Sequence, residues 1–524
     1  MRASRHGAAF ALALALGWSS AAAADPASSI SQYGITWTFD GPHEVGQFAS
    51  GDYWVVGPVT IQSVSPAPTG TRNGSCVNPM GGRQGYDDRG GEYDTADCVS
   101  VPYTLAVDES LVSSVSKPEG GDFLNVGCLQ SQAVLTAVGA PPAAGTLRPA
   151  YAGTYKHSPS TAQIQWSLLP NLPAPSPKPD GAQLLLQAER PRIDHLSSWT
   201  IQLSCAQDNW NNGPGAHACY GREYSTFISQ AAQYVMLDTS ERDELVISLI
   251  QYGIDNYGVI RAGGNFAPNG GHHSGRKWPI VFAARLLDDC DMLRVGLDYD
   301  ADTFGEDGQT YFGTNGEALF GWDCGGGHGS YFENGCSGSG AKDCRDPAGL
   351  VDGCEDYRNC CTSAYWVGQM LATLMLHAET IWNHDAYFAY VDRWMSGDVA
   401  GGGSAAGAFV DAMWSLYRNS LPPGSAASTT CGSPGDGGAD DAGSGGDDAG
   451  SGGDAASSAA DGGAGRDAGS GGASDAGDSA ARDDVSGGCG CRTAPTAPSL
   501  GWLGLVALAI GLARGRPTGR GRAR

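Results

Sequence analysis

The densest group of chemically reactive side chains lies in the segment 269–277, with the sequence NGGHHSGRK. A neutral imidazole accepts a proton well near pH 7, because its reference pKa is about 6.5. A guanidinium and an amide neutralise a carboxylate or a developing oxyanion. The segment therefore predicts acid–base chemistry beside an anionic group, although two histidines that only hydrogen-bond within their loop would give the same pattern. The candidates are Asn269, His272, His273 and Arg276 for catalysis and Lys277 for substrate binding.

Further candidates for substrate binding lie on either side of this segment. Glu223 and Tyr224 belong to the motif YGREY at the entrance of an expected helix, where a plain charge pair is the alternative. Trp322 and His328 lie in the long Gly- and Cys-rich segment 298–361. Long loops on a helical scaffold often carry function, and exposed aromatic rings in them stack on sugars. Packing among disulfides is the alternative for these two residues.

Helical periodicity on both sides of the histidines predicts the elements that position them. Leu245, Leu249 and Tyr252 mark one apolar face of a helix, and further apolar residues mark an adjacent face. Such a wide apolar surface is typical of a helix packed on two sides. Ser240 and Ser274 are expected to cap the helices that follow them. Helices are predicted at 227–237, 240–257, 277–289, 363–382, 385–395 and 409–418.

The first part of the chain has the pattern of β-strands. Ile35, Trp37 and Phe39 alternate with threonines, which is the period of a half-buried strand. Gly and Pro clusters separate the strand candidates. The fold class is therefore predicted to be α+β, with an N-terminal β-sandwich followed by an α/α toroid-like domain of helical hairpins. The other strands are predicted at 53–61, 133–138 and 184–188.

Both ends of the chain carry export signals. Two arginines, an apolar run and an Ala-Ala-Ala site follow one another in 1–24, as in a secretory signal peptide. The segment 422–488 is rich in Gly, Ser, Ala and Asp and is expected to be a disordered stalk. A Cys-Gly-Cys motif, an apolar run at 500–513 and an arginine cluster complete the chain. This tail resembles the C-terminal sorting tail of myxobacterial surface proteins, which implies attachment to the outer surface by an anchoring machinery; a plain single-pass membrane anchor is the alternative.

The domain boundaries follow from these changes of composition. We expect an exported, monomeric protein that faces the cell exterior. The expected parts are a signal peptide at 1–24, a β-sandwich at 25–205, a toroid-like domain at 206–421, a stalk at 422–488 and a sorting tail with an apolar helix at 489–524.

Charge and cysteine content limit the partners and the compartment. The chain has 31 Lys and Arg against 56 Asp and Glu, a net charge of −25, which weighs against nucleic-acid binding. Two of the 15 cysteines lie in the tail, and in an exported protein the others indicate disulfides rather than a zinc site. The pattern Asp298-x-Asp300-x-Asp302 lacks the Gly and Glu of an EF-hand. No metal or cofactor is therefore predicted, and calcium bound by Glu306 and Asp307 is kept as an alternative.

A β-sandwich joined to an α/α toroid, with Asn, His, Arg and Tyr in a cleft, resembles polysaccharide lyases of the alginate and hyaluronate type. The order of the two domains here differs from several of those enzymes. The resemblance implies β-eliminating cleavage of a uronate-containing polysaccharide, with a histidine as base. It also implies a tyrosine that protonates the leaving oxygen, and Tyr252 is our candidate.

Two other functions fit the same sequence. A glycoside hydrolase needs two carboxyl groups across the scissile bond. A non-catalytic surface adhesin would bind carbohydrate without turnover. The carboxyl groups available to a hydrolase are Glu223, Asp255, Glu306 and Asp307.

Overall fold

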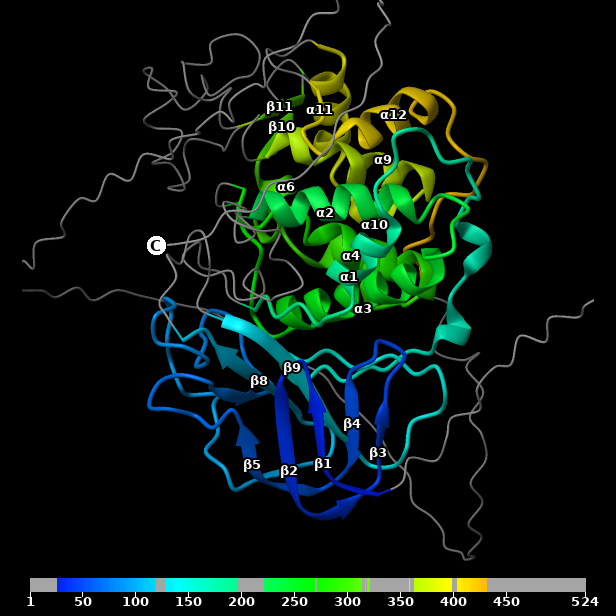
Figure 1. The fold of residues 1–524 in the computed structure, drawn as a ribbon. Helices are drawn as coiled ribbons and strands as arrows, with labels where there is room; N and C mark the ends of the chain where they lie inside the picture. The colour runs from blue at the N-terminus through cyan, green and yellow to red at the C-terminus, as the bar shows by residue number, and fades with distance from the viewer. Residues whose placement is uncertain are drawn as a thin grey trace, which may run out of the picture. The chain divides into compact units, whose positions relative to one another are not determined.

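The computed structural model describes residues 26–118, 129–195, 221–268, 271–312, 316, 318–320, 358, 362–397 and 403–430. All of these residues belong to one unit of the chain, spanning 1–444. Within that unit, sheets in the N-terminal part precede helices in the C-terminal part, so the predicted α+β class is confirmed. Figure 1 shows the N-terminal strands in blue to cyan and the helices in teal to orange.

Nine N-terminal strands form two sheets within the described residues. All pairs in these sheets are antiparallel except β4 with β9, which run parallel. The first sheet has the order β1 (Ala27–Gln32), β2 (Ile35–His43), β5 (Val59–Ser65) and β7 (Tyr103–Leu105). The second has the order β3 (Val45–Gln47), β4 (Tyr53–Val56), β9 (Leu129–Val138), β8 (Ser110–Ser116) and β6 (Ser75–Val77).

The two sheets enclose one apolar core, as in a sandwich. Trp37 and Phe39 of β2 point into it and pack with residues of the opposite sheet, including Leu111 and Leu135. The Trp37 indole donates a hydrogen bond of 3.0 Å to Ser113 Oγ, which satisfies its one polar group inside the core. The predicted alternation along β2 is confirmed, since its first five residues are alternately buried and half-buried.

The helical part begins with α1 and contains a two-stranded hairpin. Apolar side chains from β8 and β9 join its core, so both faces of the second sheet are covered. In Figure 1, α3 is the long helix next to the sheets. The helices are α1 (Gly181–Ala188), α2 (Gly221–Tyr234), α3 (Arg242–Arg261), α4 (Lys277–Leu287), α5 (Val295–Asp298), α6 (Gly305–Gly308), α9 (Val367–Met375), α10 (Glu379–Trp382), α11 (Asp385–Met395) and α12 (Ala408–Tyr417), and the hairpin is β10 (Thr310–Phe312) with β11 (Ala318–Phe320).

Close contact between α3 and α4 fixes the frame that carries the histidine segment. A Cβ atom on Gly253 of α3 would lie 2.2 Å from the carbonyl oxygen of Pro279 in α4. Only glycine allows the two helices to come so close. From Leu245 to Ile260 α3 is buried almost all round, as its wide apolar surface predicts.

Several predicted elements differ from the structure. The segment 184–188, expected as a strand, is part of helix α1, because Asp180 caps that helix by accepting the Ala182 N–H at 3.0 Å. The run 53–61 is divided into β4 and β5 at Gly57-Pro58, since proline lacks the N–H that a sheet requires. The helix expected at 363–382 is broken into a 3-10 turn, α9 and α10.

Neither serine expected as a helix cap has that role. Helix α3 begins after Glu241 and α4 begins after Arg276, and no side chain caps either helix. Ser274 instead accepts a buried hydrogen bond of 3.2 Å from the Trp366 indole. Ser274 lies three residues before the first residue of α4, too far to serve as its N-cap.

Candidate functional site

The histidine segment is a tight turn pressed against the first residue of α2. A Cβ atom on Gly221 would lie 2.0 Å from the Gly271 carbonyl oxygen, so the two backbones touch. Gly275 has a φ of +91°, which L side chains rarely adopt. Its N–H donates to Glu306 Oε1 at 2.5 Å. Glycine and a buried carboxylate therefore hold the turn that carries His272, His273 and Arg276.

One ring nitrogen of His273 makes a hydrogen bond, and the other has no hydrogen-bond partner among the described residues. Its Nδ1 lies 2.8 Å from the Ala267 carbonyl oxygen. Because a carbonyl oxygen only accepts, Nδ1 carries the proton and Nε2 carries the lone pair. Nε2 has no hydrogen-bond partner among the described residues. Burial, assisted by nearby Arg276, lowers the pKa of His273 to about 4, so the ring is neutral at pH 7.

His272 precedes it in the same turn and is also buried. It is 8% exposed, against 2% for His273. Burial is the main cause that lowers the pKa of His272 to about 3, with His273 and Arg276 adding to it. Both imidazoles are therefore neutral bases at pH 7. We favour His273 as the candidate base because its hydrogen bond to Ala267 fixes which ring nitrogen carries the proton.

Arg276 is buried completely and uses two of its three nitrogens within the fold. Nε donates to Asp194 Oδ2 at 2.7 Å, and Nη1 donates to the Ser274 carbonyl oxygen at 2.8 Å. Nη2 has no partner among the described residues. The guanidinium lies 4.4 Å from the centre of the Tyr224 ring, a cation–π arrangement. One N–H face of a rigidly held cation is therefore left for an anion.

Asp194 is a site residue that sequence reasoning missed. Arg192 Nε approaches its Oδ2 at 3.7 Å, and the Arg192 guanidinium lies 3.8 Å from the Tyr224 ring centre, so Tyr224 lies against both guanidiniums. Burial alone would raise the pKa of Asp194, but Arg276 and Arg192 outweigh it and hold the pKa below its usual value. The signal in the sequence was the charged run RPRIDH, whose Asp194 lies 82 residues before Arg276.

Lys277 was predicted to bind substrate, but in the structure other groups of the protein bind its ammonium group. Its Nζ forms an ion pair with Asp307 and donates to the Trp382 carbonyl oxygen at 2.6 Å. Asp307 also accepts a hydrogen bond of 2.8 Å from the Trp382 indole. Lys277 is 1% exposed, so it supports the helices around the site.

Tyr252 also has its hydroxyl group engaged. Its O–H points to the Gln187 and Arg190 carbonyl oxygens, at 3.2 Å each. Burial raises its pKa above the usual value. A phenol held in this way does not deliver its proton to a substrate without first breaking these bonds.

Glu223, the candidate at the start of α2, pairs with neighbouring Arg222 at 2.8 Å, and burial raises its pKa.

The other carboxyl groups considered for hydrolysis are also held by the fold. Asp255 forms a buried ion pair with Arg148, and Asp307 pairs with Lys277. Glu306 Oε1 accepts a hydrogen bond from Gln369 at 3.0 Å as well as the Gly275 N–H, and burial raises its pKa. Its Oε2 has no partner among the described residues.

Three predicted site residues, Asn269, Trp322 and His328, lie outside the described residues, as do the signal peptide, most of the stalk and the apolar tail. In the described part of the chain, no three His, Cys, Asp or Glu side chains are grouped to hold a metal ion. None of the helices in that part combines the length and the apolar run needed to cross a bilayer.

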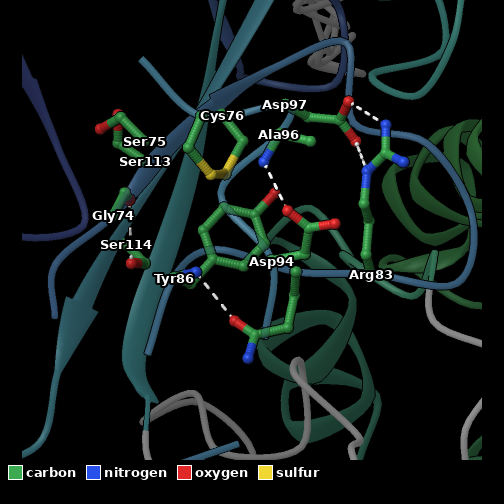
Figure 2. The surroundings of a disulfide bond; sticks show 12 residues. Gly74, Ser75, Cys76, Arg83, Tyr86, Asp94, Ala96, Asp97, Ser113 and Ser114 are labelled. Atoms are coloured by element: carbon green, nitrogen blue, oxygen red, sulfur yellow. Dashed lines mark hydrogen bonds and ion pairs between the residues drawn. A yellow bond between two sulfur atoms is a disulfide. The ribbon is translucent and has the colours of Figure 1, made fainter. Parts of the chain in front are cut away.

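The sandwich reaches the site through a loop that a disulfide closes. Cys76 and Cys98 are bonded, and Figure 2 shows the Tyr86 ring beside them. The same loop touches the helical part, because a Cβ atom on Gly81 would lie 2.4 Å from Gly264 Cα. Gly82 donates its N–H to the His195 carbonyl oxygen at 3.1 Å. Cys290 is disulfide-bonded as well, in keeping with the predicted use of cysteines.

The described site thus gathers His273, Arg276, Asp194 and Tyr224 from three separate stretches of the chain. Comparison of the sequence and the structure with models of protein families, with curated proteins and with solved structures finds no match.

Proposed function

We propose that this chain is an exported enzyme, held at the cell surface, that cleaves a uronate-containing polysaccharide by β-elimination. One observation carries the proposal. A neutral imidazole with its lone pair on Nε2 lies beside a guanidinium whose Nη2 has no partner among the described residues. A base next to an anion-binding cation is what abstraction of a proton beside a carboxylate requires.

The chemistry assigned to each group is as follows. Arg276 Nη2 donates to the uronate carboxylate and stabilises the charge that develops on it. His273 Nε2 takes the proton from the carbon next to that carboxylate. The electron pair of the broken C–H bond forms the carbon–carbon double bond, and the bond to the glycosidic oxygen breaks. The imidazolium of His273 then returns the proton to the leaving oxygen, a role that Tyr252 is poorly placed to fill because its hydroxyl serves two carbonyl groups.

Asp194 is the residue that orients the cation. Its carboxylate fixes Arg276 Nε, while Tyr224 covers one face of the guanidinium. Because Arg276 and His273 are 0% and 2% exposed, a substrate reaches them only when the packing around them opens. Such opening steps are common in enzymes that exclude water from a reaction. The α/α toroid arrangement, the stalk and the surface-sorting tail are part of the same proposal.

One assay tests it. The protein is incubated with alginate, polygalacturonate, hyaluronan and xylan, and the absorbance of unsaturated uronates and new reducing ends are followed separately. We expect both signals to rise with at least one acidic polymer. His273→Gln should lower the rate by about 100-fold or more, the usual contribution of a general base. His43→Gln, a histidine at the end of β2, is the matched control and should retain full activity.

Other outcomes would identify a different function. Reducing ends without unsaturated product would indicate a hydrolase and would direct attention to Glu306. Binding without either signal would indicate an adhesin. Full activity of His273→Gln would exclude His273 as the base, even if the polymer is cleaved.

A further inference from the structure

A second group of buried polar atoms lies on the other side of Asp194. His195 follows Asp194 in the chain, and its ring is flanked by Tyr86 and Tyr151, each with ring centres 5.8 Å away. Both contacts are edge-on, with interplanar angles of 70° and 63°. Tyr86 comes from the disulfide-closed loop of the sandwich shown in Figure 2. The group therefore joins the sheets to the segment that orients Arg276.

Three polar atoms of this group make no hydrogen bond to any described residue. They are Nδ1 and Nε2 of His195 and the hydroxyl oxygen of Tyr86. The backbone of Arg83 approaches the His195 ring without reaching hydrogen-bonding geometry. Tyr86 is 0% exposed and His195 is 1% exposed, so bulk water does not satisfy them. Tyr151 differs, since its oxygen accepts the Asp194 N–H at 2.8 Å.

Such atoms destabilise a fold unless something else binds them. Each buried polar atom left without a partner costs stability, and apolar side chains of similar shape would avoid this cost. Proteins keep destabilising arrangements of this kind mainly at functional sites. The three atoms therefore point to a polar ligand rather than to a role in packing.

The chemistry of the group selects the kind of ligand. Burial lowers the pKa of His195 to about 4, so the ring is neutral at pH 7 and offers one donor and one acceptor. The Tyr86 hydroxyl also donates and accepts. A hydroxyl group complements both, whereas a carboxylate would leave the histidine acceptor unpaired. Because Tyr86 and His195 are 0% and 1% exposed, a sugar hydroxyl group reaches them only when the packing around them opens.

We propose that Tyr86 and His195 form an uncharged subsite that binds hydroxyl groups of the carbohydrate whose carboxylate Arg276 holds. This inference rests on the proposed function. Under this proposal, the two parts of the protein recognise different groups of the carbohydrate. The helical part supplies the charge, and the sandwich loop supplies the selection for hydroxyl groups. Gly81 and Gly82 keep that loop against the helical part.

Tyr86→Phe and His195→Leu test the subsite by opposite effects on stability and binding. Binding of alginate, polygalacturonate, hyaluronan and xylan is measured by calorimetry, in a His273→Gln background that prevents cleavage. Losing one neutral hydrogen bond should weaken binding by about 3- to 10-fold. The melting temperature should stay the same or rise, because an unpaired buried polar atom is removed. Tyr257→Phe is the control: its hydroxyl donates to the Asp291 carbonyl oxygen at 3.1 Å, so we expect a lower melting temperature and unchanged binding.

The possible results separate this inference from the proposed function. Weaker binding by both variants supports the subsite, even if no polymer is cleaved and the lyase proposal fails. Unchanged binding, or a melting temperature that falls as in Tyr257→Phe, would show that the atoms serve the fold, for example through a buried water molecule, and would overturn the subsite alone. Failure of all four polymers to bind would overturn both proposals.

Discussion

Arg148 and Asp255 form a two-pronged ion pair in the interior of the protein. Nη1 lies 2.9 Å from Oδ1 and Nη2 lies 2.7 Å from Oδ2. Arg148 Nε also donates to Asp52 Oδ2 at 2.6 Å, and Asp52 belongs to the turn between β3 and β4. Since Asp255 belongs to α3, one guanidinium ties the sandwich to the helical part.

Removal of one partner from this pair should destabilise the protein strongly. Arg148 is 0% exposed and Asp255 is 1% exposed. Arg148→Leu would leave two carboxylates buried without their cation, a change that typically costs about 3–5 kcal/mol. The free energy of unfolding is measured by urea denaturation. Arg294→Leu, which breaks a solvent-exposed pair with Asp298, is the control and should leave it unchanged. Equal stability of the two variants would contradict the assignment.

Three buried histidines should make the protein sensitive to mild acid. Burial lowers the pKa of His272 to about 3 and that of His273 and His195 to about 4. Their reference pKa is about 6.5, so between pH 6.5 and 4 the unfolded chain binds protons that the folded chain does not. Stability therefore falls as pH falls through this window. Near pH 5 these residues should contribute a slope of about 4 kcal/mol per pH unit.

The pH dependence is checked by comparing variants, because carboxyl groups also titrate in acid. His195→Leu should reduce the slope of the unfolding free energy against pH between pH 6.5 and 4. The reduction should be about 1.4 kcal/mol per pH unit, which is the effect of one proton. His157→Gln should leave that window unchanged and should instead remove a loss of stability that occurs above pH 6.5, since a hydrogen bond to Asp289 raises the pKa of His157. The stability that His157 adds is present below pH 6.5 and is lost as pH rises through its folded pKa. An unchanged slope in His195→Leu would show that this ring is protonated in the fold.

The contact between α3 and α4 should not tolerate a methyl group. In Gly253→Ala the new Cβ would lie 2.2 Å from the Pro279 carbonyl oxygen and 2.6 Å from Ala283 Cβ. We expect a loss of about 1–3 kcal/mol, as for other overpacked cores. Gly41→Ala in β2 meets nothing within 4 Å and is the matched control; its stability should be equal or slightly higher. Similar stabilities of the two variants in denaturant would show that α3 and α4 leave room for a methyl group.

The Cys76–Cys98 disulfide should stabilise the loop that supplies Tyr86. The two cysteines are 22 residues apart, so closing the loop is worth about 3 kcal/mol in the chain-entropy account. Replacement of both cysteines by alanine should lower the unfolding free energy by that amount. Under the hydroxyl-subsite proposal it should also weaken carbohydrate binding. If the variant is as stable as the parent protein, another contact holds the loop in place. One such contact is the ion pair between Arg83 Nη2 and Asp97 Oδ1, which lie 2.5 Å apart.

The sequence predicted the elements near the site well where periodicity was strong. The helix at 385–395 matches α11, and the alternation at 35–39 matches β2. Predictions that depended on one local signal were less successful. The apolar run at 184–188 fits a strand or a helix equally well, and the Asp180 cap decides for the helix. The serine caps were wrong because α3 and α4 begin after Glu241 and Arg276. Ser274 instead accepts a hydrogen bond from Trp366, a residue 92 positions away.

The sequence by itself determined that sheets precede helices and that imidazole and guanidinium groups share one turn. Both follow from short-range patterns, namely the period of apolar residues and the spacing of glycines. Only the tertiary structure decided what these groups contact. It placed Asp194 on Arg276, gave Lys277 to Asp307 and left His273 Nε2 without a partner among the described residues. These outcomes depend on contacts between residues far apart in the chain, because burial and hydrogen-bond partners are set by packing and not by sequence neighbours.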